Sequence, residues 1–198
     1  MLVFWEQNLV ILSVPKTGST ALDHALGPRA SMILRDPPQL KHAPVYRYSR
    51  FLQPLFVQAG GQRPELLGVI RQPVDWLGSW FRYRGRDDLA GHPNSTKGVS
   101  FDDFVLEYCK GSPAPFAAVG SQARFLGDGK GSCEVDHLFR YEAQEALLAF
   151  LSDRLGFAID LPRMNVSPPG QPVLSPDVEA RLRGKRPAEF ALWEAARA

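Results

Sequence analysis

Short apolar runs alternate along the chain with longer stretches that carry apolar residues at helical spacing. Runs of this length that are rich in Val, Ile, Leu and Phe are typical of buried strands. The pattern predicts strands at 1–5, 9–14, 31–34, 65–70 and 136–141. The polar residues 6–8 separate the first two strands.

Helices are expected between the strands and after the last one. The apolar spacing and the capping residues predict helices at 21–26, 45–58, 73–84, 100–109, 142–155 and 177–196. We expect the second to be interrupted near Pro54 and the last to be strained near Pro187. Strands that alternate with helices indicate a three-layer α/β/α fold with a mostly parallel central sheet. The length fits one domain over 1–198.

The loop after the second predicted strand contains one lysine among small and hydroxyl residues. It comprises Pro15, Lys16, Thr17, Gly18, Ser19 and Thr20, and the predicted helix 21–26 follows at once. Unpaired amides at a helix N-terminus attract anions, and Lys16 adds a full positive charge. The order differs from the GxxxxGK[ST] loop of nucleotide hydrolases, in which the lysine follows the second glycine. A phosphate or sulfate is the expected ligand, and a helix turn capped by Ser19 or Thr20 is the alternative.

A second basic position follows the strand 65–70. Arg71 comes directly after that strand, Pro73 suits the first turn of a helix, and Ser79 lies about two turns along it. A nucleotide hydrolase would instead place an aspartate here to help hold magnesium. The planar guanidinium of Arg71 suits a phosphate, and a surface ion pair is the alternative.

Both segments resemble the cofactor motifs of sulfotransferases that use 3′-phosphoadenosine 5′-phosphosulfate (PAPS). The loop is similar to their PKxGTT motif. The second segment is similar to RxPxDxxxSxxxxxR, which Arg71, Pro73, Asp75 and Ser79 match, while its last arginine falls on Gly85, between Arg84 and Arg86. The resemblance implies a P-loop-like sulfotransferase fold in which Pro15 to Thr20 hold the 5′-phosphosulfate and Arg71 and Ser79 hold the 3′-phosphate.

Later segments extend the resemblance towards the carbohydrate sulfotransferases. Lys41-His42-Ala43-Pro44 is similar to a segment in which a histidine acts as base, so His42 is the expected catalytic base. Lys16 is the other expected catalytic residue. His24, His92, His137 and Asp36 are alternatives. Residues 161–167 resemble an LPxxNxS element near the cofactor, which implicates Asn165 and Ser167.

Composition limits the cellular setting and the partners. The formal charge of +2 gives no support to nucleic-acid binding, and two distant cysteines suggest neither a disulfide framework nor a zinc site. Without a run of about 18 apolar residues we expect no membrane span and a cytoplasmic protein. Local basic clusters suit an anionic cofactor or acceptor, or a solvated face; they comprise Arg82, Arg84 and Arg86, and Lys41, Arg47 and Arg50.

The sequence therefore favours transfer of a sulfuryl group from PAPS to the hydroxyl of a small molecule or glycan, with no metal required. Two alternatives stay open. One is a P-loop small-molecule kinase that depends on magnesium. The other is a catalytically silent PAPS-binding domain.

Overall fold

A mixed β-sheet organises the chain. The computed structural model describes residues 1–161 and 172–198. In that part of the chain five strands form one sheet in the order β3-β1-β2-β4-β5. They are β1 (Leu2–Phe4), β2 (Leu9–Ile11), β3 (Met32–Ile33), β4 (Glu65–Ile70) and β5 (His137–Arg140). β2, β4 and β5 pair in parallel, whereas β1 is antiparallel to β2 and β3. The α/β class is confirmed, but the sheet is mixed where we expected it to be mostly parallel.

A four-residue connection explains the antiparallel pair. Only residues 5–8 join β1 to β2, and the amide of Asn8 donates to the carbonyl of Trp5 at 3.0 Å. Asn8 has a positive φ of 50°, which asparagine tolerates better than most residues. A connection this short can form a hairpin but cannot cross over to a parallel neighbour.

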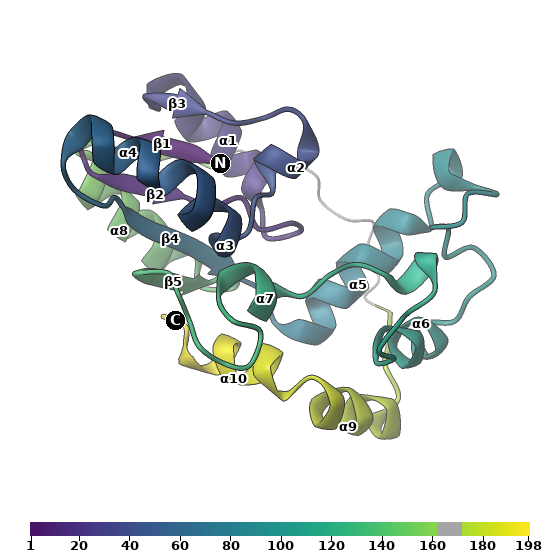
Figure 1. Ribbon diagram of the computed structural model, residues 1–198. Helices are drawn as coiled ribbons and strands as arrows, with labels where there is room; N and C mark the ends of the chain where they lie inside the picture. Colours follow the sequence, from purple (N-terminus) through teal and green to yellow (C-terminus); the bar gives the residue numbers. More distant parts are fainter. Residues whose placement is uncertain (162–171) are drawn as a thin grey trace.

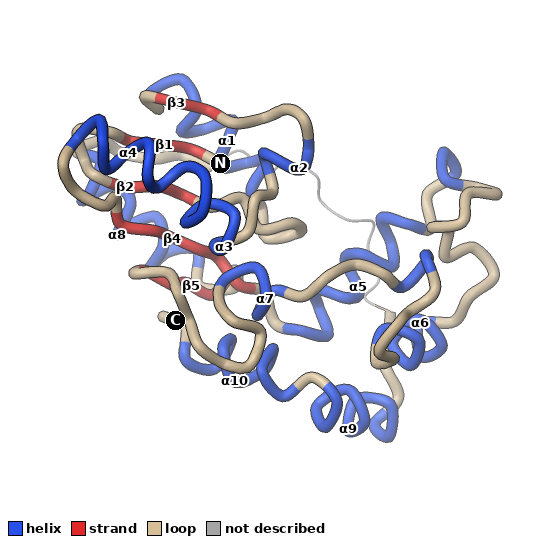
Figure 2. The backbone as a smooth tube through the Cα atoms, in the orientation of Figure 1, coloured by secondary structure: helices blue, strands red, loops and turns tan. Residues whose placement is uncertain are grey.

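Helices occupy about half of the chain and lie around the sheet and beyond one end of it (Figures 1 and 2). The longer ones are α1 (Ser19–Leu26), α4 (Gln53–Gly60), α5 (Pro73–Arg84), α6 (Phe101–Tyr108), α8 (Gln144–Leu155), α9 (Pro176–Lys185) and α10 (Pro187–Ala195). The shorter ones are α2 (Pro38–Lys41), α3 (Val45–Arg47), the π-helical turn η2 (Tyr48–Leu52) and α7 (Gln122–Leu126). Single 3₁₀ turns are η1 (Gly27–Arg29), η3 (Asp87–Leu89) and η4 (Pro115–Ala117). The pattern of the sequence did not predict α2 and α7.

The two faces of the sheet are buried by different helices. Alternate strand residues point to opposite faces, so Val10 and Leu66 pack on one side while Ile11 and Leu67 pack on the other. The first face is covered by α3, α4, α7 and α10, and the second by α1 and α8. This arrangement gives the three layers that the sequence predicted.

A third apolar cluster lies among helices at the end of the sheet where β4 leads into α5 (Figure 1). Trp76 and Leu77 of α5 pack there against Phe104 and Tyr108 of α6 and against α9 and α10. The aromatic side chains of α6 thereby fix the direction in which α5 leaves the sheet. This matters because α5 carries Ser79.

Two prolines have the effects that their chemistry requires. Pro54 has no amide donor, and the interruption expected there is a π-helical turn just before it, in which the amide of Gln53 donates to the carbonyl of Tyr48. Pro187 separates α9 from α10, with Arg186 between them. The predicted strain near Pro187 is therefore a break between two helices.

None of the helices within residues 1–161 and 172–198 combines the length and the apolar character needed to cross a membrane.

Gly68 provides a test of how closely α7 packs on the sheet. A Cβ at Gly68, in the middle of β4, would overlap the Cδ2 methyl of the fully buried Leu126. We expect Gly68→Ala to lower the free energy of unfolding by about 1 to 3 kcal/mol, because overpacking displaces a side chain that has no free space. Urea denaturation followed by circular dichroism measures the change.

Gly184→Ala is the matched control, since a Cβ at this position in α9 meets no atom within 4 Å in the described part of the chain. It should raise the free energy of unfolding by about 0.5 to 1 kcal/mol through the helix propensity of alanine. Equal stability of Gly68→Ala and the unmodified protein would show that α7 does not pack tightly on β4.

Candidate functional site

The parallel pairing of β2 with β4 brings the two sequence-predicted segments to one edge of the sheet. Leu9, Val10 and Ile11 lie opposite Glu65, Leu66 and Leu67. The chain then leaves β2 towards Lys16 and leaves β4 directly at Arg71. The carboxyl edge of such a sheet is where α/β proteins bind ligands. The prediction that Lys16 and Arg71 lie at the same edge is confirmed.

The loop between β2 and α1 has a left-handed backbone at two positions. Lys16 has a φ of 67° and Gly18 a φ of 76°. The conformation is strained at Lys16 but costs Gly18 little. The hydroxyl of Thr17 donates to the carbonyl of Val14 at 2.9 Å and holds the turn. Gly18 is the N-cap of α1 and no side chain caps the helix, so the expected capping by Ser19 or Thr20 is wrong.

The amides of this loop are free to bind a ligand. Within residues 1–161 and 172–198, the amides of Lys16, Thr17 and Gly18 donate to no backbone carbonyl. Those of Ser19 and Thr20 lie in the first turn of α1, where amides lack a partner within the helix. Such a run of amides at a helix N-terminus forms an anion site.

Helix α5 is attached to the loop by a tryptophan. The indole Nε1 of Trp76 donates to the carbonyl of Pro15 at 2.9 Å. Ser79 follows one turn later and is buried. Residues three or four apart lie on the same side of a helix, so Ser79 lies on the side of α5 that is turned to the loop. The structure therefore brings Ser79 to the same edge as Lys16.

Lys16 lies against aromatic rings of α5. Its Nζ is 3.8 Å from the centroid of the Tyr83 ring and 5.4 Å from that of Trp80. Burial, followed by the positive charges of Arg86, Arg71 and Arg82, lowers the pKa of Lys16 to about 8. A bound anion would relieve this concentration of positive charge.

Arg71 is held by its backbone, and its guanidinium is left for other contacts. The side-chain amide of Gln122 accepts from the Arg71 amide and donates to the Arg71 carbonyl, both at 2.9 Å. The guanidinium lies 4.7 Å from the centroid of the Tyr141 ring. Its Nε is buried and has no hydrogen-bond partner in the described part of the chain. A surface ion pair was the alternative for Arg71, and Arg71 forms none within residues 1–161 and 172–198.

Three side chains that sequence reasoning left out of the site also lie at this edge. Arg82 follows Ser79 by three residues on α5, and burial and then the charge of Arg71 lower the pKa of Arg82. Tyr141 follows β5 directly, and its ring lies 3.1 Å from the position of a Cβ on Gly18. The helical spacing from Ser79 could have indicated Arg82, and the position directly after a strand could have indicated Tyr141. Nothing in the pattern indicated Gln122.

The arginines next to the displaced motif position have structural contacts. The guanidinium of Arg84 is buried and donates to the carbonyls of Pro115 and Ala118 at 2.6 and 3.1 Å. It therefore anchors the segment that follows α6. Arg86 pairs with Asp88 at 3.1 Å and lies 4.1 Å from the Tyr83 ring centroid. Of these two arginines, Arg86 is the one whose charge acts on Lys16.

His42 meets the end of β2. Its Nδ1 lies 2.7 Å from the carbonyl oxygen of Ser13, which can only accept, so Nδ1 carries the proton and donates. The lone pair of a neutral imidazole is then on Nε2. Burial lowers the pKa of His42, although the bond to Ser13 opposes the shift. A half-buried neutral imidazole with a fixed tautomer is suited to accept a proton.

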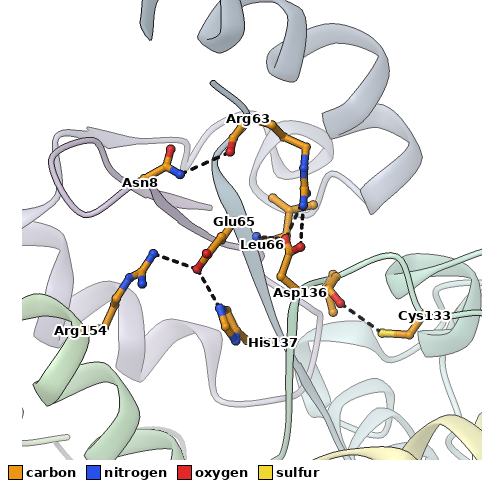
Figure 3. Close-up of polar contacts among 9 residues, drawn as sticks. Asn8, Arg63, Glu65, Leu66, Cys133, Asp136, His137 and Arg154 are labelled. Carbon is orange, nitrogen blue, oxygen red and sulfur yellow. Dashed lines mark hydrogen bonds and ion pairs between the residues drawn. The ribbon is translucent and has the colours of Figure 1, made fainter. Parts of the chain in front are cut away.

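The other candidate bases lie in different surroundings. His137 is at the amino end of β5, where its Nε2 is 2.9 Å from Glu65 Oε2, and Arg154 binds the same oxygen at 2.8 Å (Figure 3). This network ties together the strand ends opposite to the Lys16 edge. His24 and Asp36 are exposed, and His92 accepts from the amide of Asn94 in an exposed turn. The structure thus favours His42 among these candidates.

Asn165 and Ser167 lie outside the described residues. Within the described ranges no group of three or more His, Cys, Asp or Glu side chains is arranged to hold a metal ion. Comparison of the chain with protein-family models, with curated proteins and with solved structures finds no match.

The lowered pKa of Lys16 predicts a pH dependence of anion binding. An anion binds the protonated ammonium, so the affinity for sulfate should be level below about pH 7 and fall by about tenfold from pH 7 to pH 9. Sulfate keeps its charge over this range, so the change reports on the protein. Isothermal titration at a series of pH values measures it.

Lys16→Arg is the control, because its guanidinium stays charged and should give a level profile over the same range. A level profile in the unmodified protein would show that Lys16 does not bind the anion or does not titrate near pH 8.

Proposed function

We propose that this chain is a PAPS-dependent sulfotransferase that acts on an acceptor hydroxyl. The observation that carries the proposal is the pair of anion-binding elements at one sheet edge, namely the amide-lined loop with Lys16 and the guanidinium of Arg71. Their separation into two elements suits a ligand that carries an anionic group at each of two places. PAPS is such a ligand, with a 5′-phosphosulfate and a 3′-phosphate.

The chemistry of the donor set fits this cofactor. Arg71 and Arg82 each have a buried Nε without a hydrogen-bond partner in the described residues. Neither they nor Lys16 form an ion pair there. Buried donors of this kind are normally satisfied, so their free state favours an external anion as their partner. Pro15 to Thr20 would hold the 5′ end, and Arg71 and Ser79 the 3′-phosphate, with Arg82 close to both.

Each residue then has a distinct task. When bound, PAPS supplies an activated sulfuryl group. The Lys16 ammonium stabilises negative charge at the 5′ end, where its fixed position makes it effective without reorganisation. His42 accepts the proton of the acceptor hydroxyl at Nε2, and the carbonyl of Ser13 keeps the ring oriented and stabilises the imidazolium. Tyr141 lies between the Gly18 turn and the Arg71 guanidinium and keeps the two anion sites at a fixed separation.

The residue at the end of β4 favours this proposal over a magnesium-dependent kinase. A P-loop kinase needs a carboxylate near the loop to hold the metal. Here the position directly after β4 is Arg71, and the positive charges around Lys16 repel a divalent cation. This positive potential suits a nucleotide whose phosphate or phosphosulfate group carries one or two negative charges and binds without a metal ion.

Titration with three nucleotides tests the proposal. We expect adenosine 3′,5′-bisphosphate to bind more tightly than ADP, and magnesium to leave its affinity unchanged. Tight binding of magnesium-ATP with weak binding of the bisphosphate would support the kinase instead. Arg71→Ala should weaken the binding of the bisphosphate by about 2 to 4 kcal/mol. It should leave the binding of AMP nearly unchanged, because AMP lacks the 3′-phosphate.

Arg71→Lys is the matched variant, since it keeps the charge and loses the planar fork. It should recover a part of the lost affinity only. Equal losses for AMP and the bisphosphate in Arg71→Ala would show that Arg71 supports the fold and does not select the 3′-phosphate.

A further inference from the structure

The helical segment from α3 through η2 to α4 has an unusual outer face. Val45, Tyr48 and Phe56 point into the core beneath it. Most of the residues between them are exposed, and three of the exposed ones are large and apolar. Phe51 is 64 % exposed, Tyr46 55 % and Leu55 54 %. A surface helix normally has polar residues on this side.

Two arginines share this face with the apolar side chains. Arg47 lies 5.8 Å from the Tyr46 ring centroid, and Arg50 lies 5.3 Å from the Phe51 ring centroid. Neither arginine forms an ion pair with the residues that the structure describes. We refer to these five residues, Tyr46, Arg47, Arg50, Phe51 and Leu55, as the outer face of α3–α4.

The charge of the surrounding segment has one sign. Between Asp36 and Glu65 the sequence contains no aspartate or glutamate, but it contains Lys41, Arg47, Arg50 and Arg63. Of these, Arg63 is paired with Asp136. The whole chain has a formal charge of only +2, so this segment is locally far more basic than the rest. An occupant of this face must therefore be anionic as well as able to accept apolar side chains.

We propose that the outer face of α3–α4 binds the surface of an anionic phospholipid bilayer. Exposed Phe, Tyr and Leu side chains on a basic helix are the composition of helices that lie in the membrane interface. The rings and Leu55 would enter the region between headgroups and acyl chains, and the guanidinium groups would contact lipid phosphates. This proposal is independent of the sulfotransferase function.

The alternative of a dimer through this face is less favourable. In a twofold-symmetric dimer the same patch lies on both subunits, so Arg47 and Arg50 would face their own copies. The segment offers no carboxylate to pair with them. A soluble anionic polymer would match the charge, but it would give no role to Leu55 and to the apolar surface of Phe51.

Vesicle sedimentation tests the proposal. The protein should bind vesicles of phosphatidylcholine with about 30 % phosphatidylserine, and bind vesicles of phosphatidylcholine alone at least tenfold more weakly. Arg47→Gln and Arg50→Gln should each weaken binding by roughly fivefold. The double variant Phe51→Ser, Leu55→Ser should weaken vesicle binding by more than tenfold. Raised salt should weaken the binding of the unmodified protein to anionic vesicles.

Val173→Ser is the control, because Val173 is 89 % exposed and lies outside the outer face. It should bind as the unmodified protein does, and circular dichroism would confirm that all variants are folded. Three results would each overturn the proposal. The first is equal binding to neutral and anionic vesicles, or binding to neither. The second is a concentration-dependent dimer that Phe51→Ser abolishes. The third is an absence of vesicle binding together with heparin binding that is unchanged in the double serine variant.

Discussion

The parallel pairing of β2 with β4 is the constraint on which the candidate site depends. Their register aligns Ile11 with Leu67, and the amide of Leu12 continues the ladder by donating to the carbonyl of Leu67 at 2.9 Å. Because both strands run in the same direction, the loop that carries Lys16 and the position of Arg71 meet at one edge. A change in register would move both groups and turn the apolar strand residues to the wrong faces.

The fold keeps Lys16, Arg71 and Arg82 close together at that edge without pairing any of the three to a carboxylate in the described residues. Contacts that do not neutralise charge hold them. Aromatic rings lie against Lys16 and Arg71, and backbone bonds from Gln122 fix the Arg71 peptide. Such an arrangement lowers the stability of the free protein and favours an anionic ligand, which is the usual exchange between stability and function at a binding site.

Local patterns in the sequence predicted the strands that carry the site, the strand–loop–helix unit at Lys16 and the position of Arg71 at a strand end. The sheet was predicted as mostly parallel although the short connection 5–8 already implied a hairpin. Other features were beyond the sequence because they depend on residues distant along the chain. Gln122 binds the backbone of Arg71, 51 residues away, and the Lys16 ammonium lies over the ring of Tyr83 in α5. Hydrophobic spacing carries no information on such pairs.

The most direct test of the sulfotransferase proposal is the release of adenosine 3′,5′-bisphosphate from PAPS in the presence of a panel of small-molecule and glycan hydroxyl acceptors. The proposal predicts release that depends on an acceptor and is lost in His42→Ala, while that variant still binds the bisphosphate. PAPS that binds tightly but is not consumed with any acceptor would contradict it and indicate a silent binding domain. Release that is unchanged in His42→Ala would contradict the assignment of the base.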